Sequence, residues 1–125
     1  MRAEARTFLG LYESMDHRSP IPERERKIEQ LEQLALADET VKDARAECVQ
    51  AHRTLIRAER ENETASGQLD RALGAQPGGD PLPVSETERI RAVISSAEAA
   101  LIDARKRFER CEEQARGLAM RFGKR

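Results

Sequence analysis

Two cysteines and one histidine are the residues of this 125-residue chain whose types and spacing could support chemistry. Cys48 and His52 are four residues apart, so a helix would place both side chains on one face. Together with Cys111 they could supply three ligands to a zinc ion. No fourth ligand is apparent, and Arg45 and Arg105 would repel a cation, so we predict no metal site.

The two cysteines could instead react with each other. A hairpin that brings Cys48 and Cys111 into one layer would allow a disulfide if their Cα atoms come within about 7 Å. Free cysteine is also among the most frequently buried residue types. A cytosol would keep both thiols reduced. We therefore favour two reduced core residues and keep a redox pair as the alternative.

No other residue pattern indicates catalysis. The sequence contains no Ser/His/Asp arrangement, no Gly-rich phosphate loop and no dinucleotide fingerprint. Carboxylates such as Glu59, Glu61 and Glu63 are spread over expected helix surfaces, without a cleft to shift their pKa values. His17 lies in an expected turn and is assigned no role. We predict that the protein is not an enzyme and needs no cofactor.

The composition indicates a shape rather than a reaction. Ala, Glu, Arg, Lys and Leu make up 68 of the 125 residues, above the roughly one half that is typical of long-helix and coiled-coil chains. Charged residues reach 36%, whereas three phenylalanines, one tyrosine and no tryptophan leave little bulky apolar surface for a broad core. We predict an all-α protein held together by a thin helical seam.

Proline and glycine divide this helical sequence into segments. Pro20 and Pro22 separate an N-terminal amphipathic segment, residues 1–18, from the rest of the chain. Its helix should cover about residues 2–16, with Gly10 as a weak point.

A long antiparallel hairpin is expected from residue 23 to residue 122. Its first helix should run without a break over residues 23–73, and the Pro/Gly loop 74–84 should turn the chain back. Its second helix should begin at Ser85, where Ser85 and Glu88 match a capping box. The architecture, a short N-terminal helix plus a two-helix coiled coil, resembles helical-hairpin chaperones and secretion-stalk proteins.

A seven-residue repeat indicates how the two long helices face each other. If the loop folds the chain back tightly, Cys48 faces Cys111 and Asn62 faces Ala97. We interpret Asn62 as a core residue that helps to set the register. One series of the first helix consists of Val41, Cys48, Leu55, Asn62 and Leu69, and the series that faces it consists of Ile90, Ala97, Ala104, Cys111 and Leu118. The other series of the second helix, which consists of Ile94, Leu101, Phe108, Ala115 and Phe122, faces alanines of the first helix.

The hairpin leaves residues 23 to about 33 without a partner in its second helix. The N-terminal helix could fold back over this overhang as a third core helix, or it could bind another protein or a second copy of the chain. Both interpretations stay open. The candidate partner-binding residues are Phe8, Leu9, Tyr12, Met15, Ile28 and Leu31.

The charge balance limits the classes of partner. A net charge of -1 and a pI near 6.2 provide no basic field over the whole domain, so we expect no nucleic-acid partner. The basic residues that crowd positions 105–125 should be neutralised by the acidic segment 23–47. No run of about 20 apolar residues or signal-peptide pattern is present, so we expect no membrane span and a cytoplasmic location.

These observations favour a non-enzymatic protein–protein interaction module. An adaptor, an assembly factor or a small chaperone would fit, with an unidentified protein partner and a homodimer as one way to assemble. The alternative is a redox-responsive regulator that uses Cys48 and Cys111.

Overall fold

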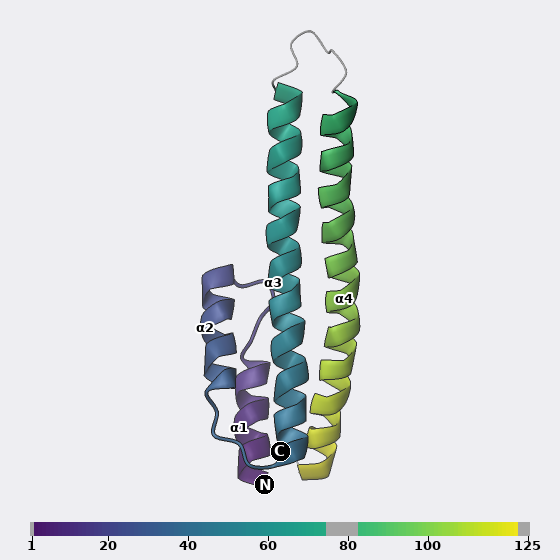
Figure 1. The fold of residues 1–125 in the computed structure, drawn as a ribbon. Coiled ribbons are helices and arrows are strands. Elements are labelled where there is room, and N and C mark those ends of the chain that lie inside the picture. The colour runs from purple at the N-terminus through teal and green to yellow at the C-terminus, as the bar shows by residue number, and fades with distance from the viewer. Residues whose placement is uncertain (1, 75–82, 123–125) are drawn as a thin grey trace.

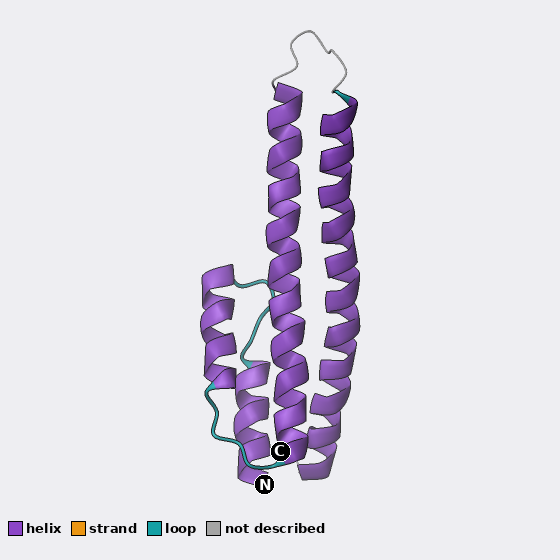
Figure 2. Cartoon of the chain, in the orientation of Figure 1, coloured by secondary structure: helices purple, strands orange, loops and turns teal. Residues whose placement is uncertain are grey.

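The computed structural model describes residues 2–74 and 83–122, and within these ranges the protein is all-helical. Two long helices lie side by side as an antiparallel hairpin, and two short helices pack beside its lower half (Figures 1 and 2). The all-α fold is therefore confirmed. Most of the expected loop 74–84 lies outside the described residues. The four helices are α1 (Arg2–Glu13), α2 (Ile21–Glu32), α3 (Glu39–Gly74) and α4 (Val84–Phe122).

The prediction of one unbroken helix over residues 23–73 is wrong. The chain leaves the helix after Glu32 and begins a new one at Glu39. Gln33 ends α2, and its backbone N–H points back to carbonyl oxygens of the last turn. Asp38 precedes α3, and its carboxylate accepts a hydrogen bond from the backbone N–H of Val41 at 3.1 Å, as an N-cap does.

Side chains from other elements stabilise the linker between α2 and α3. The carboxylate of Glu4 on α1 accepts hydrogen bonds from the backbone N–H groups of Ala37 and Asp38. The guanidinium of Arg45 donates to the carbonyl oxygen of Leu34 at 2.7 Å. These bonds satisfy backbone groups that a continuous helix would have paired internally. The break allows α2 to fold back along α3 instead of projecting into solvent.

The main core lies in the lower half of the molecule, where all four helices contribute. Phe8 of α1, Ile28 and Leu31 of α2, and Leu118 of α4 are almost completely buried in one apolar cluster. α1 packs against both α3 and α4, whereas α2 packs mainly against α3. The lower half is therefore a small helical bundle rather than a two-helix hairpin.

An ion pair between a buried arginine and a partly exposed glutamate anchors the start of α2 to α3. Arg24 is only 4% exposed, and its guanidinium makes two hydrogen bonds to the carboxylate of Glu59, at 2.6 and 2.9 Å. Arg60 pairs with Glu25 at 3.0 Å, and Arg53 pairs with Glu32, so two acidic residues of α2 have partners on α3. Within residues 2–74 and 83–122, the acidic segment 23–47 and the basic residues after position 104 share one ion pair, between Glu47 and Arg110, at 3.9 Å. The acidic residues of α2 that form ion pairs there do so with α3 instead.

The upper half of the hairpin is held by a narrow seam of small residues. Ala58, Ala65 and Ala72 of α3 are buried against α4, which contributes Ala97 and Ala100. Asn62, expected in this seam, is instead exposed. Small residues let two helices approach closely, but they bury little apolar surface. The upper half therefore has a much thinner core than the lower half.

Candidate functional site

The residues that were predicted from the sequence to bind a partner lie mainly inside the protein. Phe8, Leu9, Ile28 and Leu31 are between 0 and 3% exposed, while Tyr12 and Met15 are partly buried against the same core. α1 therefore acts as a core helix, which was one of the two interpretations. Residues with this burial cannot contact another protein in this conformation.

Cys48 and Cys111 form a disulfide, with their Cα atoms 4.8 Å apart. The two residues face each other as the hairpin register predicts, but the favoured state of two reduced thiols is not the one in the structure. Both residues are fully buried. Because both sulfurs are bonded to each other, neither is available as a thiolate ligand, and no group of three or more His, Cys, Asp and Glu in the described ranges could hold a metal ion.

His52 lies one helical turn from the disulfide and is 4% exposed. Its ring packs edge-on against Phe108, with the ring centroids 4.8 Å apart, and its Nδ1 finds no hydrogen-bond partner within the described residues. Burial is the main cause that lowers the pKa of His52 from 6.5 to about 4, and the charges of Arg24 and His17 lower it further. His52 is therefore a neutral core residue at physiological pH.

We expect this buried histidine to make the fold sensitive to acid. In the unfolded chain His52 binds a proton below about pH 6.5, whereas the folded protein resists protonation down to about pH 4. Lowering the pH from 7 to 4.5 should therefore reduce the free energy of unfolding by about 2 to 3 kcal/mol, with no effect of this residue above pH 7. Urea unfolding at each pH measures the loss. In a His52→Leu variant, this part of the pH dependence of the unfolding free energy should be absent.

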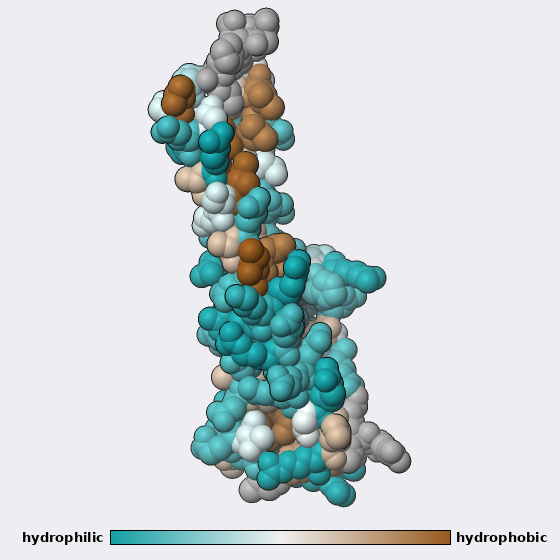
Figure 3. Space-filling view, turned by 90° about the vertical axis from the view of Figure 1, so that its right-hand side faces the viewer, coloured by the Kyte–Doolittle hydropathy of each residue, from teal (hydrophilic) through white to brown (hydrophobic). Residues whose placement is uncertain are grey.

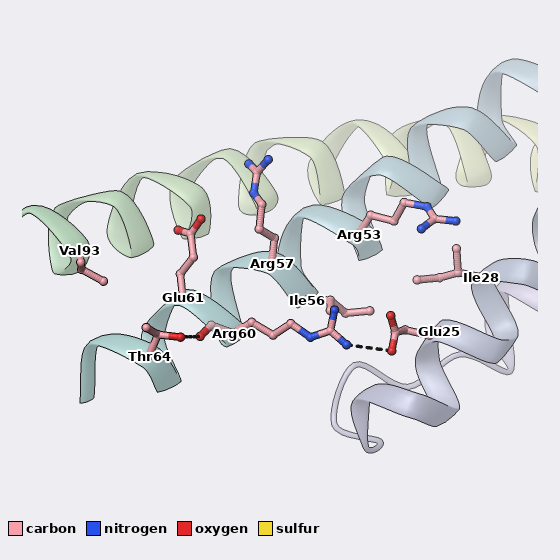
Figure 4. Close-up of a pocket in the computed structure, with 9 residues that line it drawn as sticks. All are labelled: Glu25, Ile28, Arg53, Ile56, Arg57, Arg60, Glu61, Thr64 and Val93. Carbon is pink, nitrogen blue, oxygen red and sulfur yellow. Dashed lines mark hydrogen bonds and ion pairs between the residues drawn. The ribbon is translucent and has the colours of Figure 1, made fainter. Parts of the chain in front are cut away.

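A groove of about 310 Å³ opens between α2, α3 and α4 (Figure 4). Ile28, Ile56 and Val93 supply its apolar surface, and arginines line its rim. Arg60 is paired with Glu25, and the Thr64 hydroxyl donates to the carbonyl oxygen of Arg60 at 3.0 Å. The groove therefore presents no nucleophile beside a base. Its lining residues are Glu25, Ile28, Arg53, Ile56, Arg57, Arg60, Glu61, Thr64 and Val93.

The upper half of the hairpin carries a different kind of surface. We define the distal arm as residues 58–74 of α3 and 84–104 of α4, the part that extends beyond α1. Figure 3 shows apolar side chains gathered on the upper half of one face, above a mainly hydrophilic lower half. The large hydrophobic residues exposed in the arm are Leu73 (58%), Val84 (73%), Ile94 (36%), Leu101 (41%) and Ile102 (54%).

This exposed surface was not found from the sequence. The heptad pattern placed Ile94 and Leu101 inside the seam, but alanines on α4 occupy the seam instead and leave these larger side chains at its edge. Ile102 belonged to neither expected seam. Its position next to Leu101, outside the repeat, was the available signal for a second apolar face on α4.

Neither the other features of residues 2–74 and 83–122 nor comparisons with known proteins identify what the distal arm binds. None of the helices in the described ranges carries an apolar stretch long enough to cross a bilayer. The distal arm is thus the candidate functional site, because it exposes apolar side chains that a single chain leaves uncovered. Comparisons of the chain with models of protein families, with curated proteins and with solved structures find no match in any of the three.

Proposed function

We propose that this protein is a non-enzymatic protein–protein interaction module, a helical hairpin of the coiled-coil type whose distal arm binds a helix of its partner. The observation that supports the proposal is the exposure of Leu101 and Ile102 on α4, together with Leu73 and Val84 near the tip. Several exposed apolar side chains on a thin two-helix arm are typical of a surface that another helix covers. Adaptors, assembly factors and small chaperones all fit this description.

The lower half of the protein would serve as the base of this module. The bundle formed with α1 and α2 contains the largest fully buried side chains among the described residues, and the disulfide joins α3 to α4 within it. Such a base can fold without the partner, whereas the arm has mainly alanines in its seam. The proposal therefore assigns stability to one end of the hairpin and recognition to the other.

The disulfide supports a second candidate, a redox-responsive regulator that uses Cys48 and Cys111. Thiol–disulfide exchange requires an attacking thiolate to reach one of the two sulfurs. Both cysteines are fully buried, so a thiolate cannot reach them in this conformation. Regulation would therefore require local opening of the lower bundle. The bond also bears on location, since disulfides persist mainly in oxidising compartments. An oxidising compartment therefore fits the disulfide better than the cytoplasm does.

Site-specific photo-crosslinking tests the interaction proposal. A photoreactive amino acid at position 102, in the protein expressed in its own cells, should give a covalent protein adduct after irradiation. The same amino acid at Glu113, an exposed position on the lower part of α4, is the matched control and should give none. Equal labelling at both positions, or no adduct at position 102, would contradict the proposal.

A further inference from the structure

The linker between α2 and α3 has the sequence of a helix, although it is bent in the structure. Residues 33–38 read Gln-Leu-Ala-Leu-Ala-Asp and contain no glycine, proline or β-branched residue. Alanine, leucine and glutamine are among the residues with the highest helix propensity. A helical linker would join α2 and α3 into one straight helix from Ile21 to Gly74. The linker is therefore a hinge with a second favourable conformation.

Straightening the linker leaves its backbone groups paired. In the bent form, Glu4 accepts hydrogen bonds from the N–H groups of Ala37 and Asp38, and Arg45 donates to the carbonyl oxygens of Glu32 and Leu34. In a straight helix, these N–H and C=O groups would pair with groups four residues away. The backbone therefore loses nothing when the linker becomes helical.

The cost of straightening lies in the core of the lower bundle. A single chain that straightened would carry α1 and α2 away from its own α3 and α4. Phe8, Ile28 and Leu31, which are almost completely buried, would then be exposed to water. One chain alone is therefore held in the bent form, whereas a second copy could cover these residues.

The ion pairs between α2 and α3 show that a second copy can do so in the same geometry. Glu25, near the start of α2, pairs with Arg60, and Glu32, at its end, pairs with Arg53. α2 thus runs antiparallel to α3 along the lower half of the hairpin (Figure 1). Two straightened chains that meet base to base are also antiparallel. Each α2 then reaches the partner's α3 in the direction that it has here.

We propose that two copies of the chain exchange α1 and α2, so that each lower bundle is completed by the partner's α1 and α2. The exchange preserves the core, because Phe8, Ile28 and Leu31 pack in the partner's bundle as they pack here in their own. It gains a helical linker and costs the freedom that two chains lose on association. Exchange of identical elements is a low-cost route to a dimer. The exchange goes beyond the proposed function, because the distal arm takes no part in it.

The register of the ion pairs locates the two-fold axis. Glu25 and Arg60 lie at nearly equal distances along the chain from position 42, and so do Glu32 and Arg53. Two straight antiparallel helices that keep these pairs between chains therefore have their symmetry axis near Lys42. By symmetry, each pair occurs twice in the dimer.

The residues around this axis favour the exchange by charge. Glu39 lies opposite the partner's Arg45 in this register. A straight linker frees Arg45 for this pair, because the carbonyl oxygens that it binds in the bent form become part of the helix. The two Lys42 side chains approach each other at the axis, and each keeps Glu39 of its own chain as a neighbour, at 3.5 Å in the structure.

The exchanged dimer would place two distal arms at opposite ends of one elongated particle. Each arm lies beyond the bundle that the exchange completes, so its exposed apolar residues stay exposed. One dimer could therefore hold two partner helices at the same time, which a single hairpin cannot do.

Glycine substitution in the linker tests the exchange, because glycine disfavours the straight form without removing a side-chain contact of the bent form. Each protein is refolded at a series of concentrations and measured by light scattering after size exclusion. The wild type should change from the 14.1 kDa chain mass to twice that mass as the concentration rises. In Ala35→Gly/Ala37→Gly, the dissociation constant should increase more than about 100-fold, since both chains carry two glycines in the straight helix.

Ala92→Gly/Ala99→Gly is the matched control. Both alanines are exposed on α4, which is helical in the single chain and in the exchanged dimer alike. The dissociation constant of this variant should equal that of the wild type. Linker glycines that leave the dissociation constant unchanged would overturn the exchange, as would a wild type with the mass of one chain at every concentration.

A distance measurement separates the exchange from any other dimer. Spin labels are attached to non-canonical amino acids at the exposed positions 26 and 63 of one chain, and this chain is mixed with an excess of unlabelled chain. A straight helix separates the two positions by about 55 Å. The bent form, with α2 packed beside α3, keeps them within about 25 Å. A dimer with the short distance would overturn the exchange, whereas an adduct at position 102 would still support the interaction function.

Discussion

The Phe8→Ala variant is expected to lose about 3 to 5 kcal/mol of unfolding free energy, the range measured when a buried phenylalanine is truncated. Phe8 is completely buried and lies at the centre of the apolar cluster that joins α1 to the other helices. Its removal leaves a cavity and weakens the packing of α1 on α3 and α4. Chemical denaturation followed by circular dichroism measures the change.

Met120→Ala is the control for this variant, because Met120 is 81% exposed on α4. It should change the free energy of unfolding by less than about 0.5 kcal/mol. A Phe8→Ala variant as stable as Met120→Ala would mean that α1 does not pack in solution as it does here. The interpretation of α1 as a detachable recognition helix would then replace its role in the core.

Removing the disulfide should also destabilise the protein strongly. Cys48 and Cys111 are 63 residues apart, and the chain-entropy model for a loop of this length gives about 4 kcal/mol. The Cys48→Ala/Cys111→Ala variant should therefore unfold at a much lower denaturant concentration than the oxidised wild type. The loss arises mainly because the unfolded chain gains freedom, so it should appear in equilibrium unfolding rather than in helix content.

The reduced wild type is the control, because it has the same side chains without the bond. Wild type that is reduced while unfolded and then refolded should match the alanine variant to within about 1 kcal/mol. Equal stability of the oxidised and reduced proteins would contradict the prediction. Non-reducing electrophoresis of native protein exposed to reductant tests the redox candidate, since rapid reduction without denaturant would show that the buried bond is accessible.

The hairpin could be predicted from the sequence because its signals are local. Heptads in residues 41–72 and 90–122 indicate approximately which sides of the helices meet, although they also placed the exposed residues Asn62 and Leu101 in the seam. The proline and glycine residues after Leu73 mark the turn. Chain length between the two helices then places Cys48 opposite Cys111, as the disulfide shows. Periodicity and loop length were sufficient for this part of the fold.

The break between α2 and α3 could not be predicted from the same signals. Residues 34–37 are leucine and alanine, which favour a helix, and Asp38 alone suggests a new start. Glu4 and Arg45 hold the linker through contacts that exist only after folding. Tertiary hydrogen bonds therefore override helix propensity here.

The exposed apolar surface could not be located from the sequence for a related reason. The sequence showed that Phe8 and Ile28 are apolar and in excess of what a two-helix seam needs, but it could not show that the break brings them together. Because those residues pack on each other, they are buried, and the apolar side chains that stay exposed include Leu101 and Ile102 instead. The break between α2 and α3 thus determines which apolar residues remain exposed.

Because of the position of the disulfide, the two helices can separate at one end of the hairpin but not at the other. Cys48 and Cys111 join α3 and α4 within the lower bundle, so separation of the helices that begins at the tip cannot pass this layer. The distal arm can therefore open and close as a local fluctuation, in the sense that amide hydrogen exchange detects, while the base stays intact. If the distal arm binds a partner as we propose, it can adjust to that partner repeatedly without unfolding of the whole chain.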